Sequence, residues 1–174
     1  GFYPADLRWR VNLSFILLII AIVPVLYDNM PGRKFGLWYA VAFPFITGWL
    51  LVGGFGLTPV ETDQFGGIML TLIIGVTGIS FSLPIGVLLA LGRRSNLPVL
   101  RILCVTFIEF IRGVPLIALL FIASTMLNFF LPPGTVFDLL VRVLIMVTLF
   151  SAAYIAEVVR GGLQGIPSGQ YEAA

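Results

Sequence analysis

Two pairs of glutamate and arginine interrupt strongly apolar stretches of this sequence. Glu109 precedes Arg112 by three residues, and Glu157 precedes Arg160 by the same spacing. In a helix this spacing puts both partners on one face, within pairing distance. Charges at membrane depth are costly and usually face a bundle interior or a water-filled path. Such pairs can therefore line or gate a route for a zwitterionic or charged solute.

A plainer interpretation is an ion pair at the cytoplasmic interface, with the arginine reaching towards lipid headgroups. It is the favoured interpretation for Glu157 and Arg160, because the apolar stretch ends there. For Glu109 and Arg112 both interpretations stay open. The carboxylates can also be read as a proton or ion relay.

A helix break is predicted just after Glu109, at the tetrapeptide Arg112-Gly-Val-Pro115. Gly113 and Pro115 weaken the helical hydrogen-bond ladder and free backbone groups beside a fixed cation. Broken helices at membrane depth often form solute sites in transporters. Both residues therefore join the four charged residues as candidates for a solute path.

Few side chains suited to catalysis are present. The chain has no histidine, which removes the usual general base and the commonest metal ligand. Lys34 is the only lysine, and there is no Gly-x-x-x-x-Gly-Lys-Ser/Thr loop for ATP. Cys104 is the one cysteine, and its apolar neighbours predict a buried thiol. We expect no enzymatic activity, no metal site and no bound cofactor.

Composition points to a membrane protein. Apolar residues make up 59% of the chain, charged residues 10%, and the mean hydropathy is +1.09. A soluble domain has about 25% charged residues, so this chain cannot cover a water-facing surface. The formal charge of +2 is small and the basic residues are scattered, which leaves no footprint for nucleic acid. We expect the lipid bilayer to surround it.

Five apolar stretches predict an all-α, polytopic bundle of about five transmembrane helices, because an open sheet edge cannot face lipid. The stretches are 11–27, 35–52, 65–91, 116–131 and 139–156. Residues 99–111 are apolar too, but Arg101 and Glu109 interrupt them. The third stretch contains glycines that could permit close packing; since no two form a Gly-x-x-x-Gly pair, ordinary packing is the prediction. These glycines are Gly75, Gly78 and Gly86.

Basic residues in the loops predict the orientation. If the loop with Glu61 and Asp63 lies outside, the inside receives six basic residues and the outside three. The inner six are Arg33, Lys34, Arg93, Arg94, Arg101 and Arg160, and the outer three are Arg8, Arg10 and Arg142. This orientation puts Glu172 in the cytoplasm.

The last stretch turns from apolar to polar at Glu157. It then passes through three glycines, which are poor helix-interior residues, to Pro167. The glycines are Gly161, Gly162 and Gly165. Ser168 suits the N-cap of a new helix. We expect a membrane helix to end here and a short amphipathic segment to begin on the water side, where a soluble partner can bind it.

The run from Tyr154 to Ala174 resembles the permease subunits of polar amino-acid ABC importers, and above all their general L-amino-acid branch. The run Glu109 to Leu116 resembles the same family, which more often has Thr at the position of Val114. The resemblance extends from Phe65 to Ala174. The two earlier spans resemble the extra amino-terminal helices of the general L-amino-acid branch.

The resemblance implies a type I ABC importer permease, incomplete here, that moves an L-amino acid across a bacterial inner membrane by alternating access. It implies a coupling segment that docks into a separate cytoplasmic ATP-binding subunit. The coupling residues are Gly169, Gln170, Tyr171, Glu172, Ala173 and Ala174. Two further partners are implied, a second permease subunit, identical or related, and a periplasmic or extracellular solute-binding protein.

We expect residues 1–60 to form an extra amino-terminal helix pair, and residues 61–174 the first part of the permease core. Because the family pattern continues beyond Ala174, we interpret the sequence as an internal part of a longer permease. The alternative function is an ion-coupled secondary transporter or channel that uses Glu109 and Glu157, although a cytoplasmic Glu-Ala-Ala helix has no role there.

Overall fold

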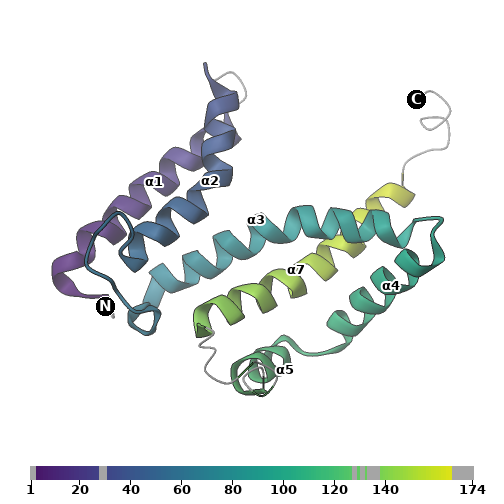
Figure 1. Cartoon of the computed structure of the whole chain (residues 1–174). Helices are drawn as coiled ribbons and strands as arrows, with labels where there is room; N and C mark the ends of the chain where they lie inside the picture. Colours follow the sequence, from purple (N-terminus) through teal and green to yellow (C-terminus); the bar gives the residue numbers. More distant parts are fainter. Residues whose placement is uncertain (1–2, 28–30, 127–128, 130–131, 133–137, 166–174) are drawn as a thin grey trace. The chain divides into compact units, whose positions relative to one another are not determined.

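The structure is a computed structural model that describes residues 3–27, 31–126, 129, 132 and 138–165, and its regular elements in these ranges are all helices. The long ones are α1 (Arg8–Leu26), α2 (Arg33–Val52), α3 (Gly67–Arg93), α4 (Pro98–Gly113) and α7 (Leu139–Gln164) (Figure 1). The short ones are the 3₁₀-helices η1 (Ala5–Leu7) and η2 (Thr62–Gln64), the α-helix α5 (Leu116–Phe121) and the π-helix η3 (Ile122–Met126). The chain divides into two compact units, Gly1–Val76 and Thr77–Ala174. The all-α prediction is confirmed.

Four helical segments are long and apolar enough to cross a membrane. They are Ala5–Leu26, Arg33–Val52, Gly67–Arg93 and Leu139–Gln164. A fifth crossing requires α4 and the segment Leu116–Met126 together, and the chain bends by 100° between them. The expected number of about five spans agrees with this. The predicted span at 116–131 is not a crossing by itself. Its described part is long and apolar enough to cross a membrane only together with α4.

Helix α7 extends further than its hydropathy predicts. The predicted span stops at Ala156, whereas the helix continues through Gly161 and Gly162 to Gln164. A glycine inside a helix costs roughly 0.5–1 kcal/mol relative to alanine. Contacts of Arg160 with side chains three residues before and four residues after it offset part of that cost. The predicted apolar span is therefore shorter than the helix, while the end at Gln164 falls within the glycine-containing stretch where the sequence predicts it.

In the first unit, α1 and α2 lie side by side (Figure 1). Their close approach depends on Gly36, because a Cβ there would lie 2.5 Å from the Cβ of Pro24. The Tyr39 hydroxyl donates a hydrogen bond to the carbonyl of Leu17 across the pair (3.1 Å). Gly32 starts α2 with a φ of +76°, a left-handed conformation that glycine adopts without strain.

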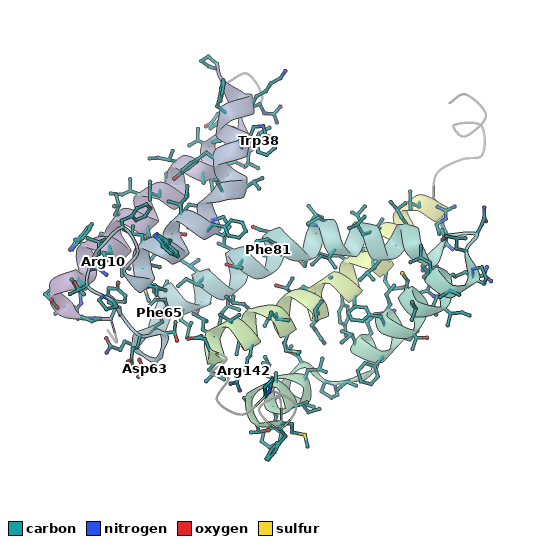
Figure 2. All side chains as sticks on the ribbon, in the orientation of Figure 1. Arg10, Trp38, Asp63, Phe65, Phe81 and Arg142 are labelled. Carbon is teal, nitrogen blue, oxygen red and sulfur yellow. The ribbon has the colours of Figure 1, made fainter. Side chains whose placement is uncertain are left out.

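The connection after α2 folds back onto this helix pair and buries Arg10, which is 1% exposed (Figure 2). The Nη1 of Arg10 donates to the carbonyl oxygen of Thr58 (2.8 Å), and its Nη2 donates to the Thr58 hydroxyl (3.0 Å). Its guanidinium also lies 5.7 Å from the centre of the Trp9 ring. Tyr3 reinforces the same region by donating to the carbonyl of Leu51 (2.8 Å), and burial raises the pKa of its hydroxyl. Arg10 therefore holds the connection in place.

Arg10→Met should destabilise this unit by about 1.5–3 kcal/mol, the range for hydrogen bonds to a charged group. The methionine keeps much of the apolar stem but cannot donate to Thr58. The measurement is the thermal unfolding of the purified full-length protein in detergent. Arg8→Met, at an exposed position on the same helix, is the matched control and should leave the transition unchanged. Equal shifts for the two variants would show that the Thr58 contacts contribute nothing.

In the second unit, α3, α4 and α7 contribute one residue each to a core of small and branched side chains. These residues are Ala90, Ile108 and Ala156. Gly86 lets α3 approach α7, since a Cβ there would lie 2.6 Å from the Cγ2 of Ile155 and 3.0 Å from the carbonyl oxygen of Ala152. Close packing at this glycine corrects the prediction of ordinary packing. Cys104 is buried, as predicted.

The start of α7 is anchored by two polar residues. The Asp138 carboxylate caps the helix by accepting hydrogen bonds from the backbone N–H groups of Leu140 and Val141. Arg142 is 8% exposed, and its Nη1 donates to the carbonyl of Ser124 in η3 (3.1 Å) (Figure 2). This contact ties α7 to the end of the bent helix pair.

Candidate functional site

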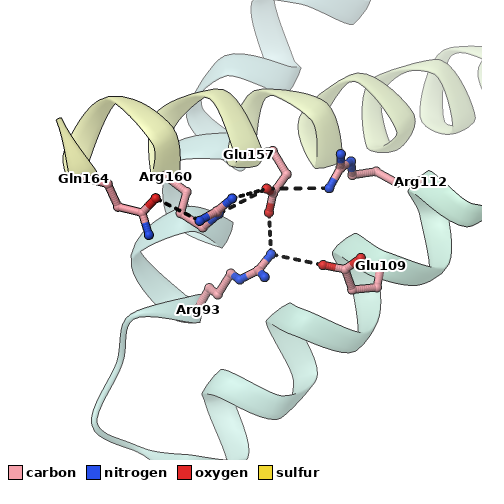
Figure 3. A network of polar contacts seen from close by, with 6 residues as sticks. All are labelled: Arg93, Glu109, Arg112, Glu157, Arg160 and Gln164. Carbon is pink, nitrogen blue, oxygen red and sulfur yellow. Dashed lines mark hydrogen bonds and ion pairs between the residues drawn. The ribbon is translucent and has the colours of Figure 1, made fainter.

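Five charged side chains gather where α3, α4 and α7 meet (Figure 3). They are Arg93, Glu109, Arg112, Glu157 and Arg160, and we call these five residues the charge cluster. Three are guanidinium cations and two are carboxylates, so the charge cluster carries one excess positive charge. The four charged residues predicted for the solute path are all members.

Glu157 is the centre of the charge cluster. Its Oε2 lies 2.9 Å from the Nη2 of Arg160 and 3.6 Å from the Nη1 of Arg112. Its Oε1 accepts a hydrogen bond from the Nη1 of Arg93. The Glu157 side chain is 15% exposed, less than any other member. A carboxylate covered to this extent depends on its cationic partners, because they compensate for lost hydration.

One of the two pairs predicted from spacing is present. The Nε and Nη2 of Arg160 both donate to the Oε2 of Glu157, at 3.1 and 2.9 Å. The Nη1 of Arg160 reaches on to the amide oxygen of Gln164 (3.0 Å) (Figure 3). Three successive turns at the end of α7 are thus linked on one face.

The other predicted pair is wrong. Glu109 contacts the Nη1 of Arg93 at 3.3 Å and has no ion pair with Arg112 in the described chain. Arg112 instead contacts Glu157 on α7, and its guanidinium lies 5.4 Å from the centre of the Tyr154 ring. The i, i+3 spacing permits a pair without requiring it. Here Glu157 on α7, which is less exposed than Glu109, contacts both Arg93 and Arg112.

Arg93 belongs to the charge cluster although sequence analysis places it only in a cytoplasmic loop. It is the last residue of α3, and its side chain is 24% exposed. Its Nη1 bridges Glu109 and Glu157, which lie 16 and 64 residues away in the sequence. No local spacing signals partners at such distances. The one available signal is a basic residue at the end of an apolar helix.

The two uncharged candidates lie at the bend between α4 and α5. Gly113 is the last residue of α4, Val114 is extended, and Pro115 caps α5. The predicted helix break beside Arg112 is therefore present, with a bend of 100°. A Cβ on Gly113 would meet nothing within 4 Å, whereas Val114 packs against the buried side chains of Ile111, Leu119 and Ala153.

The predicted coupling residues lie outside the described residues. They are Gly169, Gln170, Tyr171, Glu172, Ala173 and Ala174. The last described element before them is α7, which Gly165 caps. In the ranges that the structure describes, no group of three or more metal-ligating side chains could hold a metal ion.

The charge cluster offers accessible groups of both signs beside the bend. The Glu109 side chain is 56% exposed and that of Arg112 is 34% exposed. An exposed carboxylate can accept hydrogen bonds from an ammonium group, and a guanidinium can donate to a carboxylate. The arrangement therefore suits a zwitterion better than a solute with a single charge.

Residues 82–174 match a protein family described as "Binding-protein-dependent transport system inner membrane component". Among curated proteins, the chain is 55% identical over 177 residues to the Inner membrane amino-acid ABC transporter permease protein YhdY of Escherichia coli. It is 43% identical over 233 residues to the Glutamate/glutamine/aspartate/asparagine transport system permease protein BztC of Rhodobacter capsulatus. Both matches cover 100% of this chain, but 48% and 53% of the relatives, so the chain spans about half of their length.

A solved structure, titled "Crystal structure of an amino acid ABC transporter with histidines", resembles part of the chain. The match has a TM-score of 0.56 at 29% sequence identity, and covers 62% of this chain and 49% of that one. The helical fold of that transporter therefore extends to more than half of this sequence.

Proposed function

Because the chain belongs to the family of binding-protein-dependent transport system inner membrane components, we propose that it is the permease part of an ATP-driven importer for L-amino acids. The observation that carries the proposal is this family match, together with two relatives that are both named permease proteins and that match the whole of this chain. One of them is an amino-acid permease, and the other transports glutamate, glutamine, aspartate and asparagine by name. The ion-coupled alternative has no support among these relatives.

The proposed solute path runs past the bend between α4 and α5. It includes Glu109, Arg112, Gly113, Pro115, Glu157 and Arg160. Accessible groups of both signs beside a broken helix support this assignment, since an amino acid carries an ammonium and a carboxylate. Glu157 and Arg160 are the more shielded pair, so we assign them to the support of the path and the other two charges to contact with the solute.

ATP hydrolysis is proposed to occur in a separate cytoplasmic subunit that docks on residues 169–174. A second permease subunit would complete the path, and a solute-binding protein would deliver the amino acid from outside. Closure of the ATPase pair would draw the docking segments together and switch the bundle between outward-open and inward-open states. We also propose residues 1–60 as an amino-terminal helix pair that precedes the core, in keeping with a family match that begins at residue 82.

Co-purification of the full-length permease with its ATP-binding subunit tests the proposal. The wild-type pair should co-purify, whereas Glu172→Arg should abolish docking because it reverses a charge in the proposed contact. Glu61→Arg is the matched control: it makes the same change in a loop predicted to lie outside, and docking should persist. Membrane levels of all three proteins are compared first. If the wild type binds no ATPase, the importer proposal fails; if Glu172→Arg binds as well as the wild type, the proposed docking contact is wrong.

A further inference from the structure

We propose that Arg93 and Arg112 are positioning residues for alternating access, and that Arg112 exchanges between Glu157 on α7 and Glu109 on its own helix. This inference rests on the proposed function. In the arrangement that the structure shows, Arg112 ties α4 to α7. In the second arrangement it pairs within α4, and this polar tie between α4 and α7 is lost while the apolar packing of Ile111 and Leu119 against Ala153 remains.

The contacts of the charge cluster differ in closeness, which identifies the one that exchanges. Arg93 and Arg160 are hydrogen-bonded to Glu157. Arg112 lies 3.6 Å from the same carboxylate, the longest of the four ion pairs. Its side chain is 34% exposed, more than that of Arg93 (24%) and about the same as that of Arg160 (33%). Arg112 is therefore the partner that Glu157 gives up most easily.

A second partner for Arg112 is available on the same helix. Glu109 precedes it by three residues on α4, a spacing at which opposite charges pair. Among the described residues Glu109 has a single ion-pair partner, Arg93 at 3.3 Å, and its side chain is 56% exposed. A rotamer change of Arg112 and Glu109 is sufficient, because both residues stay on the same helix face. No backbone movement is needed before the exchange.

The position of Arg112 connects this exchange to the proposed path. It is followed by Gly113, where a side chain would meet nothing within 4 Å, and then by the 100° bend. Val114 at the bend packs against the cluster of Ile111, Leu119 and Ala153, so α5 stays in contact with α7. Loss of the Arg112 contact removes a polar tie beside the bend and so lowers the cost of a change in its angle.

Arg93 keeps the rest of the charge cluster together during the exchange. It contacts both carboxylates, so it can remain on Glu157 while Glu109 turns to Arg112. The exchange gives up Arg112–Glu157 and Arg93–Glu109 and forms Arg112–Glu109. Every carboxylate retains a cation in both arrangements. The first arrangement has four ion pairs and the second has three, so the first is the resting one, and a ligand or partner that prefers the second shifts the balance towards it.

The test uses the full-length permease, reconstituted with its ATP-binding subunit and solute-binding protein. Spin labels are attached at Ile102 on α4 and Val158 on α7, both exposed, in a Cys104→Ala background. Distances between the labels are measured without solute, in the nucleotide-free state and with ATP trapped. The wild type should change its distance distribution between these states. The Glu109→Gln variant should keep the nucleotide-free distance distribution when ATP is trapped, because Arg112 has lost its second partner.

Transport gives the second measurement. Glu109→Gln should lower the kcat of amino-acid uptake and of solute-stimulated ATP hydrolysis by about tenfold, which corresponds to a barrier higher by about 1.4 kcal/mol. Arg112→Lys retains a cation and should recover part of both activities, whereas Arg112→Met should not. Arg94→Met changes the exposed arginine next to Arg93 and should behave like the wild type.

The outcomes separate the two proposals. If Glu109→Gln changes distance with ATP as the wild type does, the exchange is refuted while the importer stands. A rise in KM with kcat unchanged would also refute it, since that is the signature of a residue that only contacts the solute. If the wild-type complex imports no amino acid, the proposed function fails, and the distance change alone then decides whether the exchange occurs.

Discussion

Glu157→Gln is expected to destabilise the protein by about 1.5–3 kcal/mol, the range for the loss of hydrogen bonds to charged groups. The side chain is 15% exposed, and its carboxylate holds Arg93, Arg112 and Arg160 around one point. Glutamine keeps the shape but leaves three guanidinium groups with little compensating charge. The measurement is the unfolding of the purified full-length permease by heat and by denaturant.

Glu109→Gln is the control for this prediction, because it makes the same chemical change at the other carboxylate of the charge cluster. Its side chain is 56% exposed and has one ion-pair partner in the part of the chain that the structure describes, so the loss should not exceed about 1 kcal/mol, as for surface ion pairs. A similar loss for both variants would contradict the central role assigned to Glu157. So would a Glu157→Gln protein that unfolds like the wild type.

Gly86→Leu should cost about 3 kcal/mol, at the upper end of the range for overpacked cores. Even the first carbon of the new side chain would lie 2.6 Å from the Cγ2 of Ile155 and 3.0 Å from the carbonyl oxygen of Ala152. Ile155 can adjust its rotamer only partly, and the carbonyl belongs to the backbone of α7. The helices must therefore separate, which opens the core that Ala90 and Ala156 share.

Gly75→Leu is the matched control on the same helix. A Cβ there would meet nothing within 4 Å, so the substitution should leave stability within about 0.5 kcal/mol of the wild type, as for ordinary surface positions. Both variants are compared with the wild type by thermal unfolding and by the yield of monodisperse protein. An equal loss at the two positions would mean that the bulk of leucine matters and the contact with α7 does not.

Hydropathy predicted three of the long helices well, because burial in lipid is a property of each stretch by itself, but it did not count α4 as a span and predicted one at 116–131 instead. Predicted spans at 11–27, 35–52 and 65–91 correspond to α1, α2 and α3 within three residues at each end. Hydropathy does not predict where α7 ends, because charged and polar residues interrupt the apolar sequence from Glu157 onwards while the helix continues to Gln164. There the side-chain contacts of Arg160 support two further turns.

The candidate site was only partly predictable, because its partners come from three helices. Spacing along one helix identified the pair formed by Glu157 and Arg160. It could not identify Arg93, whose contact with Glu157 joins residues 64 positions apart. It also assigned Glu109 to the wrong arginine, since a local pair and a pair between helices use the same charges.

The sequence by itself determined the membrane environment, the helical class, the break at Gly113 and Pro115, and the family to which the chain belongs. Each of these depends on residue types in a continuous stretch, or on a run of residues that relatives share. Only the tertiary structure decided which carboxylate each arginine contacts and which glycine is needed for close packing. Those choices depend on distances between helices, and residue order along one chain does not contain them.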